Sequence, residues 1–166
     1  MKTTKDLIET IKTYAQSIDS TIAKQDFDLT NSLARYLSNN KFEVKKNVKL
    51  SSINDVSGSI NNHCTISNVL VRIGTEFVPV EIKVNGEIQE YKRLINQIQN
   101  YIQDYDNVSC SLVIFVSHNS LEKDIYNLHW KIGKSAKQDY KYIIAKYATN
   151  QMGIFISKKS RRIILP

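Results

Sequence analysis

The chain contains 166 residues, of which 42% are hydrophobic and 23% are charged, and its formal net charge is +7. A chain of this size and composition buries roughly two-thirds of its unfolded surface in one globular domain, which excludes dependence on disulfide staples. Its two cysteines lie in apolar segments, and no apolar run reaches membrane length. We therefore expect a single-domain, reduced, cytoplasmic protein with no membrane partner.

The first part of the chain predicts two helices followed by a strand. Apolar residues at helical spacing predict a helix over residues 3–24 and a shorter helix over residues 28–38. Residues 42–50 alternate apolar with basic side chains, which is typical of a strand. A polar loop follows over residues 51–62.

A hairpin is the next predicted element, over residues 64–84, where two β-branched runs flank the Gly-Thr pair at 74–75. A two-residue turn at this pair places Asn68 directly opposite Glu81. Because side chains alternate between the two faces of a strand, Glu81 and Lys83 project on the same face as Asn68. Three polar groups therefore converge on one face of the hairpin.

The second part of the chain continues the alternation of helices and strands. Apolar spacing predicts a helix over residues 87–105, and the almost wholly apolar run 110–116 predicts a central strand covered on both faces. A capping-box pattern predicts another helix over residues 119–132. Further strands are expected over residues 140–147, 152–157 and 162–165. Since no linker or repeat interrupts this order, the chain is predicted to be one α/β domain.

Positive charge gathers in the C-terminal part of the chain. Residues 126–166 contain nine Lys and Arg against a single acid, and aromatic residues lie between them. This pattern is typical of a surface that follows nucleic-acid phosphates, although a solvated lysine-rich face gives a similar pattern. The candidate nucleic-acid-binding residues are Lys131, Lys134, Lys158, Lys159, Arg161 and Arg162.

The order of the elements and two short motifs resemble a known nuclease family. A helix, a strand and a hairpin ending in Glu81-Ile82-Lys83 precede a helix that carries Gln97 and Tyr101 at Gln-x-x-x-Tyr spacing, and a buried strand follows. This arrangement is similar to the core of the PD-(D/E)XK nuclease superfamily, and it implies a restriction-endonuclease-like mixed β-sheet flanked by helices. The resemblance divides the chain into an N-terminal helix (1–26), the core (27–117) and a basic C-terminal helix with strands (118–166).

The resemblance also implies a function, that of a metal-dependent DNA endonuclease that hydrolyses phosphodiester bonds. Glu81 and the backbone carbonyl of Ile82 are then ligands of Mg²⁺ or Mn²⁺, since hard cations prefer oxygen donors. Lys83 is the catalytic cation that stabilises charge developing in the transition state. Gln97 and Tyr101 complete the catalytic set by orienting the nucleic-acid backbone or water. DNA is the expected partner, and a homodimer is compatible with the family, whose members often pair to cut both strands.

Two positions depart from the family pattern. Asn68 stands where the family places an acid opposite Glu81, and Asn31 lies on the second helix where many relatives have Glu. An amide offers a carbonyl oxygen, but the lost negative charge weakens binding of Mg²⁺. The candidate metal ligands are therefore Glu81, Asn68, Asp55 and the carbonyl of Ile82, with Asp26 and Asp28 as nearby carboxylates.

Two functional classes remain open from these residues. The first is an active Mg²⁺-dependent nuclease. The second keeps the fold without the chemistry, and binds nucleic acid or a protein through the basic C-terminal part. A purely structural alternative makes Glu81 and Lys83 an exposed pair on a polar sheet face, with Gln97 and Tyr101 on the flank of an ordinary packed helix.

Overall fold

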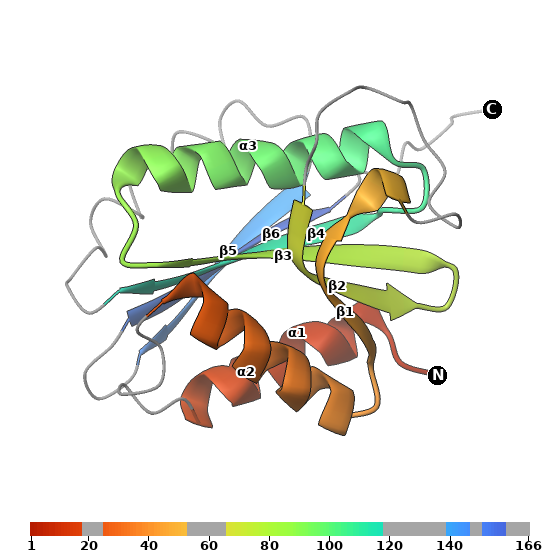
Figure 1. The fold of residues 1–166 in the computed structure, drawn as a ribbon, viewed down its shortest axis with the longest axis horizontal. Helices are drawn as coiled ribbons and strands as arrows, with labels where there is room; N and C mark the ends of the chain where they lie inside the picture. The colour runs from red at the N-terminus through yellow and green to blue at the C-terminus, as the bar shows by residue number, and fades with distance from the viewer. Residues whose placement is uncertain (18–24, 53–65, 118–138, 147–150, 159–166) are drawn as a thin grey trace.

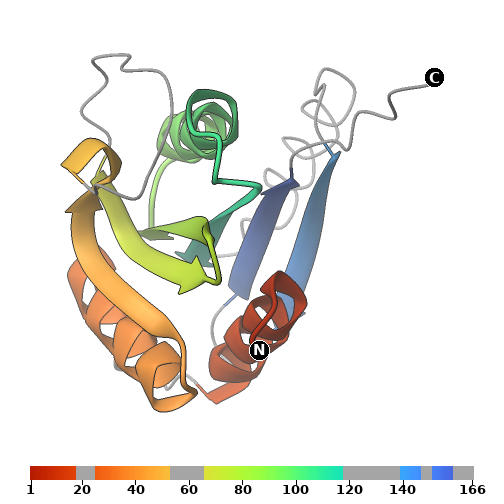
Figure 2. The same ribbon diagram turned by 90° about the vertical axis from the view of Figure 1, so that its right-hand side faces the viewer.

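The computed structural model describes residues 1–17, 25–52, 66–117, 139–146 and 151–158. These residues form a mixed α/β fold in which one six-stranded sheet lies between helices α1 and α2 on one face and α3 on the other (Figures 1 and 2). The helices are α1 (Thr4–Ser17), α2 (Asp26–Asn39) and α3 (Ile88–Asp104), with a short 3-10 turn η1 (Leu50–Ser52). The strands are β1 (Glu43–Lys49), β2 (Ile66–Ile73), β3 (Glu76–Val84), β4 (Cys110–Ser117), β5 (Asp139–Lys146) and β6 (Gln151–Lys158).

The strands follow the order β1-β2-β3-β4-β6-β5 across the sheet. β3 and β4 pair in parallel, whereas the other described neighbours pair antiparallel. The parallel pair is joined by α3, which crosses one face of the sheet as such a connection requires (Figure 1). The α/β fold class predicted from the sequence is confirmed.

β2 and β3 form the predicted hairpin in the predicted register. Gly74 lies in the turn with a φ of +63°, a conformation that glycine adopts without steric cost. Val69 pairs with Val80 in the ladder, so the next residues along the two strands are Asn68 and Glu81. The turn therefore places Asn68 beside Glu81, as the sequence predicts.

Alternation along β3 separates an apolar core from a polar site. Val80 and Ile82 are buried with Leu112 and Ile114 of β4 in the core that α1 and α2 cover. Glu81 lies on the opposite face, where it contacts α3. The predicted separation of apolar and polar residues along this strand is confirmed.

β4 is covered on both faces, as its continuous apolar run predicts. Ile114 belongs to the core beneath α1 and α2, whereas Val113 and Phe115 pack with α3. The start of α3 is fixed by a capping box in which Glu87 and Glu90 each bind the other's backbone N–H. This capping box holds Glu90 near the end of β3.

The second helix and the first strand differ from the sequence predictions. α2 begins at Asp26 rather than at Asp28, so one more acidic residue, Asp26, lies in its first turn beside Asp28. In β1 the backbone at Asn47 has a φ of +50°, and the ladder with β2 skips this residue, which explains the interrupted alternation. The helix predicted over residues 119–132 and the strand predicted over residues 162–165 lie outside the described part of the chain. Among the described helices, none combines the length and apolar character needed to cross a membrane.

Candidate functional site

A polar pocket of about 360 Å³ lies beside the C-terminal half of β3. It is bordered by the start of β2, the first turn of α2 and the middle of α3. Its polar lining consists of Asp26, Asn68, Glu81, Lys83, Arg93 and Gln97. We call it the Glu81 pocket.

Glu81 is the buried acid of this pocket, with only 2% of its surface exposed. The Tyr101 hydroxyl donates a hydrogen bond to Glu81 Oε1 at 2.7 Å, and Gln97 Nε2 donates to the Tyr101 oxygen at 2.8 Å. Burial raises the pKa of Glu81 to about 7, although hydrogen bonds from Tyr101 and the Asn68 backbone and the charge of Arg93 act in the opposite direction. Glu81 therefore exchanges a proton near neutral pH.

Lys83 is the second charged centre of the Glu81 pocket. Its Nζ lies 3.1 Å from Asp26 Oδ2 and 3.0 Å from Glu90 Oε1. Partial burial lowers the pKa of Lys83, but the hydrogen bonds and charges of Glu90 and Asp26 outweigh burial, so the pKa lies above its ordinary value of 10.5. Lys83 is therefore a cation at neutral pH, able to stabilise negative charge but unable to accept a proton. The alternative of an exposed Glu81 and Lys83 pair is wrong, since Glu81 is buried.

Asp26 connects the first turn of α2 to the end of β3. Its Oδ2 accepts from Lys83, and its Oδ1 accepts the backbone N–H of Val84 at 2.6 Å. The N-terminus of a helix favours a carboxylate, because unpaired backbone N–H groups concentrate positive charge there. The sequence identifies Asp26 only as a carboxylate near Asn31, and no local signal indicates its contact with Lys83, which follows it by 57 residues.

Asn68 has a structural contact in the Glu81 pocket. Its side-chain Oδ1 accepts the backbone N–H of Ile82 at 2.9 Å, beyond the point where the β2–β3 ladder ends. The amide oxygen that could face a metal is therefore already engaged with the strand. Ile82 itself lines the pocket, while its side chain is buried in the core.

The other amide of the predicted site, Asn31, does not line the Glu81 pocket. Its Oδ1 accepts a hydrogen bond from Lys46 Nζ at 2.5 Å, in a separate hollow between α2 and β1. Leu29, Leu33 and Leu37 are buried in the core, and this packing turns Asn31 toward β1. Asn31, which departs from the family pattern, therefore lies outside the Glu81 pocket. Asp28 is exposed and is likewise absent from the pocket lining.

Several predicted site residues lie outside the described part of the chain. These are Asp55 among the metal ligands, and Lys131, Lys134, Lys159, Arg161 and Arg162 among the nucleic-acid-binding residues. Lys158 ends β6, but its side chain is not described.

The Glu81 pocket is lined by both acidic and basic side chains, so it can bind a cation and an anion at the same time. Glu81 and Asp26 supply carboxylates, and Mg²⁺ is commonly bound by one or two protein carboxylates while it keeps several waters. The donor set therefore fits a weak Mg²⁺ site, although within residues 1–17, 25–52, 66–117, 139–146 and 151–158 no three His, Cys, Asp or Glu gather to hold a metal. Lys83 and Arg93 lie beside these carboxylates and favour an anion such as a phosphate.

Comparisons with protein families, with curated proteins and with solved structures find no match to this chain.

Proposed function

We propose that this chain is a nuclease of the PD-(D/E)XK type that hydrolyses phosphodiester bonds in DNA with Mg²⁺ or Mn²⁺. The observation that carries the proposal is that Glu81 and Lys83 line one polar pocket with Gln97, while Tyr101 holds Glu81 from the next helix. The order α2-β1-β2-β3-α3-β4 supports it, because the resemblance to the restriction-endonuclease-like core rests on that order.

Lys83 is the residue that would stabilise the reacting phosphate. Hydrolysis of a phosphodiester builds negative charge on the phosphate oxygens, and a fixed cation beside them lowers the energy of the transition state. Asp26 and Glu90 hold Lys83 Nζ from two helices, so the cation needs little reorganisation when substrate arrives. Glu90 is accordingly a positioning residue.

Glu81 and Asp26 are the residues that would hold the metal, which supplies Lewis-acid polarisation of the phosphate when bound. Because metal ligands must be deprotonated, the pKa of about 7 at Glu81 makes binding stronger as the pH rises through neutrality. Tyr101 favours the ionised form of Glu81 by donating to it, and Gln97 orients the Tyr101 hydroxyl.

The proposal is tested by nicking of supercoiled plasmid DNA with Mg²⁺ or Mn²⁺. We expect metal-dependent nicking by the wild-type chain, a decrease of at least about 100-fold in Lys83→Met, and a comparable loss in Glu81→Gln. The matched controls are Glu9→Gln and Lys12→Met, which make the same chemical changes in an exposed ion pair on α1. Both controls should nick DNA at the wild-type rate.

Two results would contradict the proposal. One is equal nicking by the wild type and both pocket variants, since the activity then comes from elsewhere. The other is an absence of metal-dependent nicking on supercoiled, linear and single-stranded DNA.

The contact of Asn68 favours a second candidate, a nuclease fold that binds nucleic acid without cleaving it. The Asn68 amide bonds to the Ile82 backbone instead of supplying a charged ligand, which is the arrangement expected of a decayed metal site. In this candidate the wild type binds a DNA duplex in EDTA, and Glu81→Gln binds it equally well.

Asn68→Asp distinguishes the two candidates. It adds a carboxylate beside Glu81, so a decayed site should gain Mn²⁺ binding, measured by calorimetry, and metal-dependent nicking that the wild type lacks. If Asn68→Asp changes neither quantity while the wild type nicks DNA, the decayed-site candidate is excluded.

A further inference from the structure

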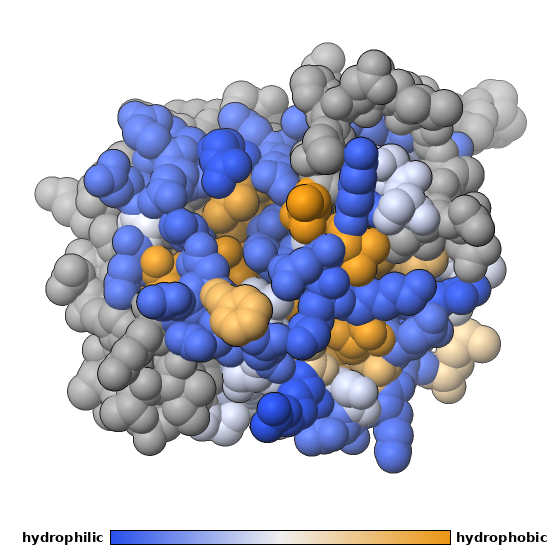
Figure 3. All heavy atoms as spheres, in the orientation of Figure 1, coloured by the Kyte–Doolittle hydropathy of each residue, from blue (hydrophilic) through white to orange (hydrophobic). Residues whose placement is uncertain are grey.

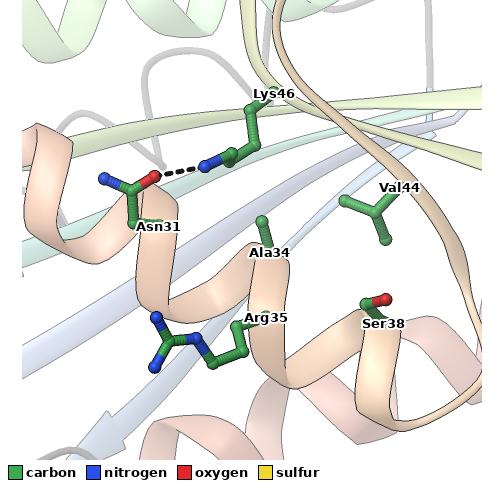
Figure 4. A pocket seen from close by; sticks show the side chains of 6 residues that line it. All are labelled: Asn31, Ala34, Arg35, Ser38, Val44 and Lys46. Carbon is green, nitrogen blue, oxygen red and sulfur yellow. Dashed lines mark hydrogen bonds between the residues drawn. The ribbon is translucent and has the colours of Figure 1, made fainter.

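A second hollow, of about 430 Å³, lies between α2 and β1 and is separate from the Glu81 pocket. We call it the α2–β1 hollow. It is lined by Asn31, Ala34, Arg35, Ser38, Val44 and Lys46, whose arrangement Figure 4 shows. None of the six lining residues is acidic.

The hollow arises from the spacing of residues on the two elements. Asn31, Arg35 and Ser38 recur at intervals of four and three residues, so they share one side of α2. Val44 and Lys46 are two residues apart and therefore share one face of β1. The small side chain of Ala34, between them, leaves room for a ligand at the surface.

The positive charge of the hollow is not neutralised within it. Lys46 Nζ donates to Asn31 Oδ1, a neutral acceptor, so the ammonium keeps its full charge. Arg35 is exposed, and no described acid forms an ion pair with it. In Figure 4 the Lys46 ammonium points toward Asn31, the Arg35 guanidinium lies apart from this contact, and the Ser38 hydroxyl lies at the far end of the hollow.

The surroundings of the hollow also favour an anion. Glu43, the acid of β1, lies on the opposite face of that strand from Lys46 and reaches Arg72 at 3.8 Å. Figure 3 shows the side of the molecule that carries α2 and β1, where hydrophilic residues predominate around small hydrophobic patches. A hydrated, uncompensated pair of cations matches a phosphate better than it matches an apolar ligand.

We propose that the α2–β1 hollow binds a backbone phosphate of nucleic acid, through the Lys46 ammonium and the Arg35 guanidinium. The inference rests on the proposed function, because it makes the hollow a second anchor for the same nucleic acid. Arg35 follows Asp26 by nine residues, so it lies about 14 Å farther along the axis of α2. A strand that crosses the Glu81 pocket and continues along α2 would place a different phosphate in the hollow.

The test measures binding of a fluorescently labelled short DNA duplex by anisotropy in EDTA over a range of salt concentrations. We expect Arg35→Gln and Lys46→Gln each to reduce the slope of log affinity against log salt by about 0.9, and the double variant by about 1.8. Arg35→Lys should keep the wild-type slope because it keeps the charge. The matched control is Lys45→Gln, which removes the same charge from the neighbouring residue of β1 on the other face of the strand and should leave the slope unchanged.

Three outcomes would overturn the inference. The first is a double variant whose slope equals that of the wild type. The second is a reduction of the slope in Lys45→Gln as large as in Lys46→Gln, which would mean that the overall positive charge of the surface, and not the hollow, determines the slope. The third is displacement of the duplex by polyglutamate as effectively as by unlabelled duplex, which would indicate an acidic polypeptide as the ligand.

Nicking assays with Mg²⁺ separate this inference from the proposed function. If the wild type nicks DNA and the double variant keeps the wild-type slope, phosphate binding in the hollow is contradicted but the proposed function is not. If the slope of the double variant is reduced and the wild type does not nick DNA, phosphate binding in the hollow is supported and the proposed nuclease activity is contradicted.

Discussion

Helix α2 lines two hollows that differ in how their charges are balanced. In the Glu81 pocket, Lys83 meets the carboxylates of Asp26 and Glu90, and Glu81 is buried beneath Tyr101. In the α2–β1 hollow, Lys46 donates to the neutral amide of Asn31 and forms no ion pair within the described residues.

This difference in charge balance indicates which hollow is suited to catalysis and which to anion binding. A network of paired and buried groups holds its members in fixed positions, and any change in it alters the stability of the fold. Exposed cations without acidic partners cost the fold little and remain available to an external anion. We therefore assign the proposed chemistry to the Glu81 pocket, whose charges are held in place, and the proposed anion binding to the α2–β1 hollow, whose cations have no described acidic partner.

The largest effect on stability is expected from Glu81→Gln. Burial raises the pKa of Glu81 from 4.5 to about 7, so the folded state holds the proton more tightly than the unfolded state. The corresponding stabilisation is full below pH 4.5 and is lost as the pH rises to about 7, which amounts to about 3 kcal/mol. The Glu81→Gln variant has no titrating group at this position, so it does not lose this stabilisation as the pH rises. The free energy of unfolding of the variant minus that of the wild type should therefore be larger at pH 8 than at pH 4.5.

Urea unfolding of both proteins at the two pH values gives that difference. The exposed substitution Glu9→Gln serves as the control and should follow the wild type at both pH values. A wild type whose stability relative to Glu81→Gln does not depend on pH would show that Glu81 is not a buried, titrating acid.

A smaller effect is expected from Tyr101→Phe, which removes the hydroxyl that donates to Glu81 Oε1. Losing a hydrogen bond to a buried carboxylate should lower the free energy of unfolding at pH 8 by about 2 kcal/mol and raise the pKa of Glu81 further. The loss should be smaller at pH 4.5, where Glu81 is protonated, and smaller again in the Glu81→Gln background. A loss that is equal in all these conditions would mean that the hydroxyl acts through packing alone.

The hairpin was predictable because it depends on local rules, whereas the contact of Tyr101 with Glu81 was implied only by the resemblance to the nuclease family. A two-residue turn at Gly74 and the period of two along a strand are enough to place Asn68 beside Glu81. The four-residue spacing of Gln97 and Tyr101 is likewise enough to place them on one side of α3, where they meet each other and Glu81.

The role of Asp26 was not predictable in this way. Its partners Lys83 and Val84 follow it by 57 and 58 residues, so the contact depends on where the sheet places the first turn of α2. The orientation of Asn31 follows from the burial of the leucines of α2, which sets the rotation of the helix about its axis and turns Asn31 toward β1.

The smallest effect is expected where Asp26 joins α2 to β3, and two variants separate its charge from its hydrogen bond. Asp26→Asn keeps an oxygen for the Val84 N–H but removes the charge beside Lys83, a pair whose side chains are 37% and 21% exposed. Because solvent screens such a pair, its loss should lower the free energy of unfolding by only a few tenths of a kcal/mol. Asp26→Ala also leaves the Val84 N–H without its acceptor and should cost about 1 kcal/mol. If both variants lose the same stability in urea unfolding, the charge and not the bond to Val84 holds α2 against the end of β3. If added salt then leaves the difference in stability between the wild type and the two variants unchanged, the attraction between Asp26 and Lys83 is not the cause, and the contact fixes the site through shape alone.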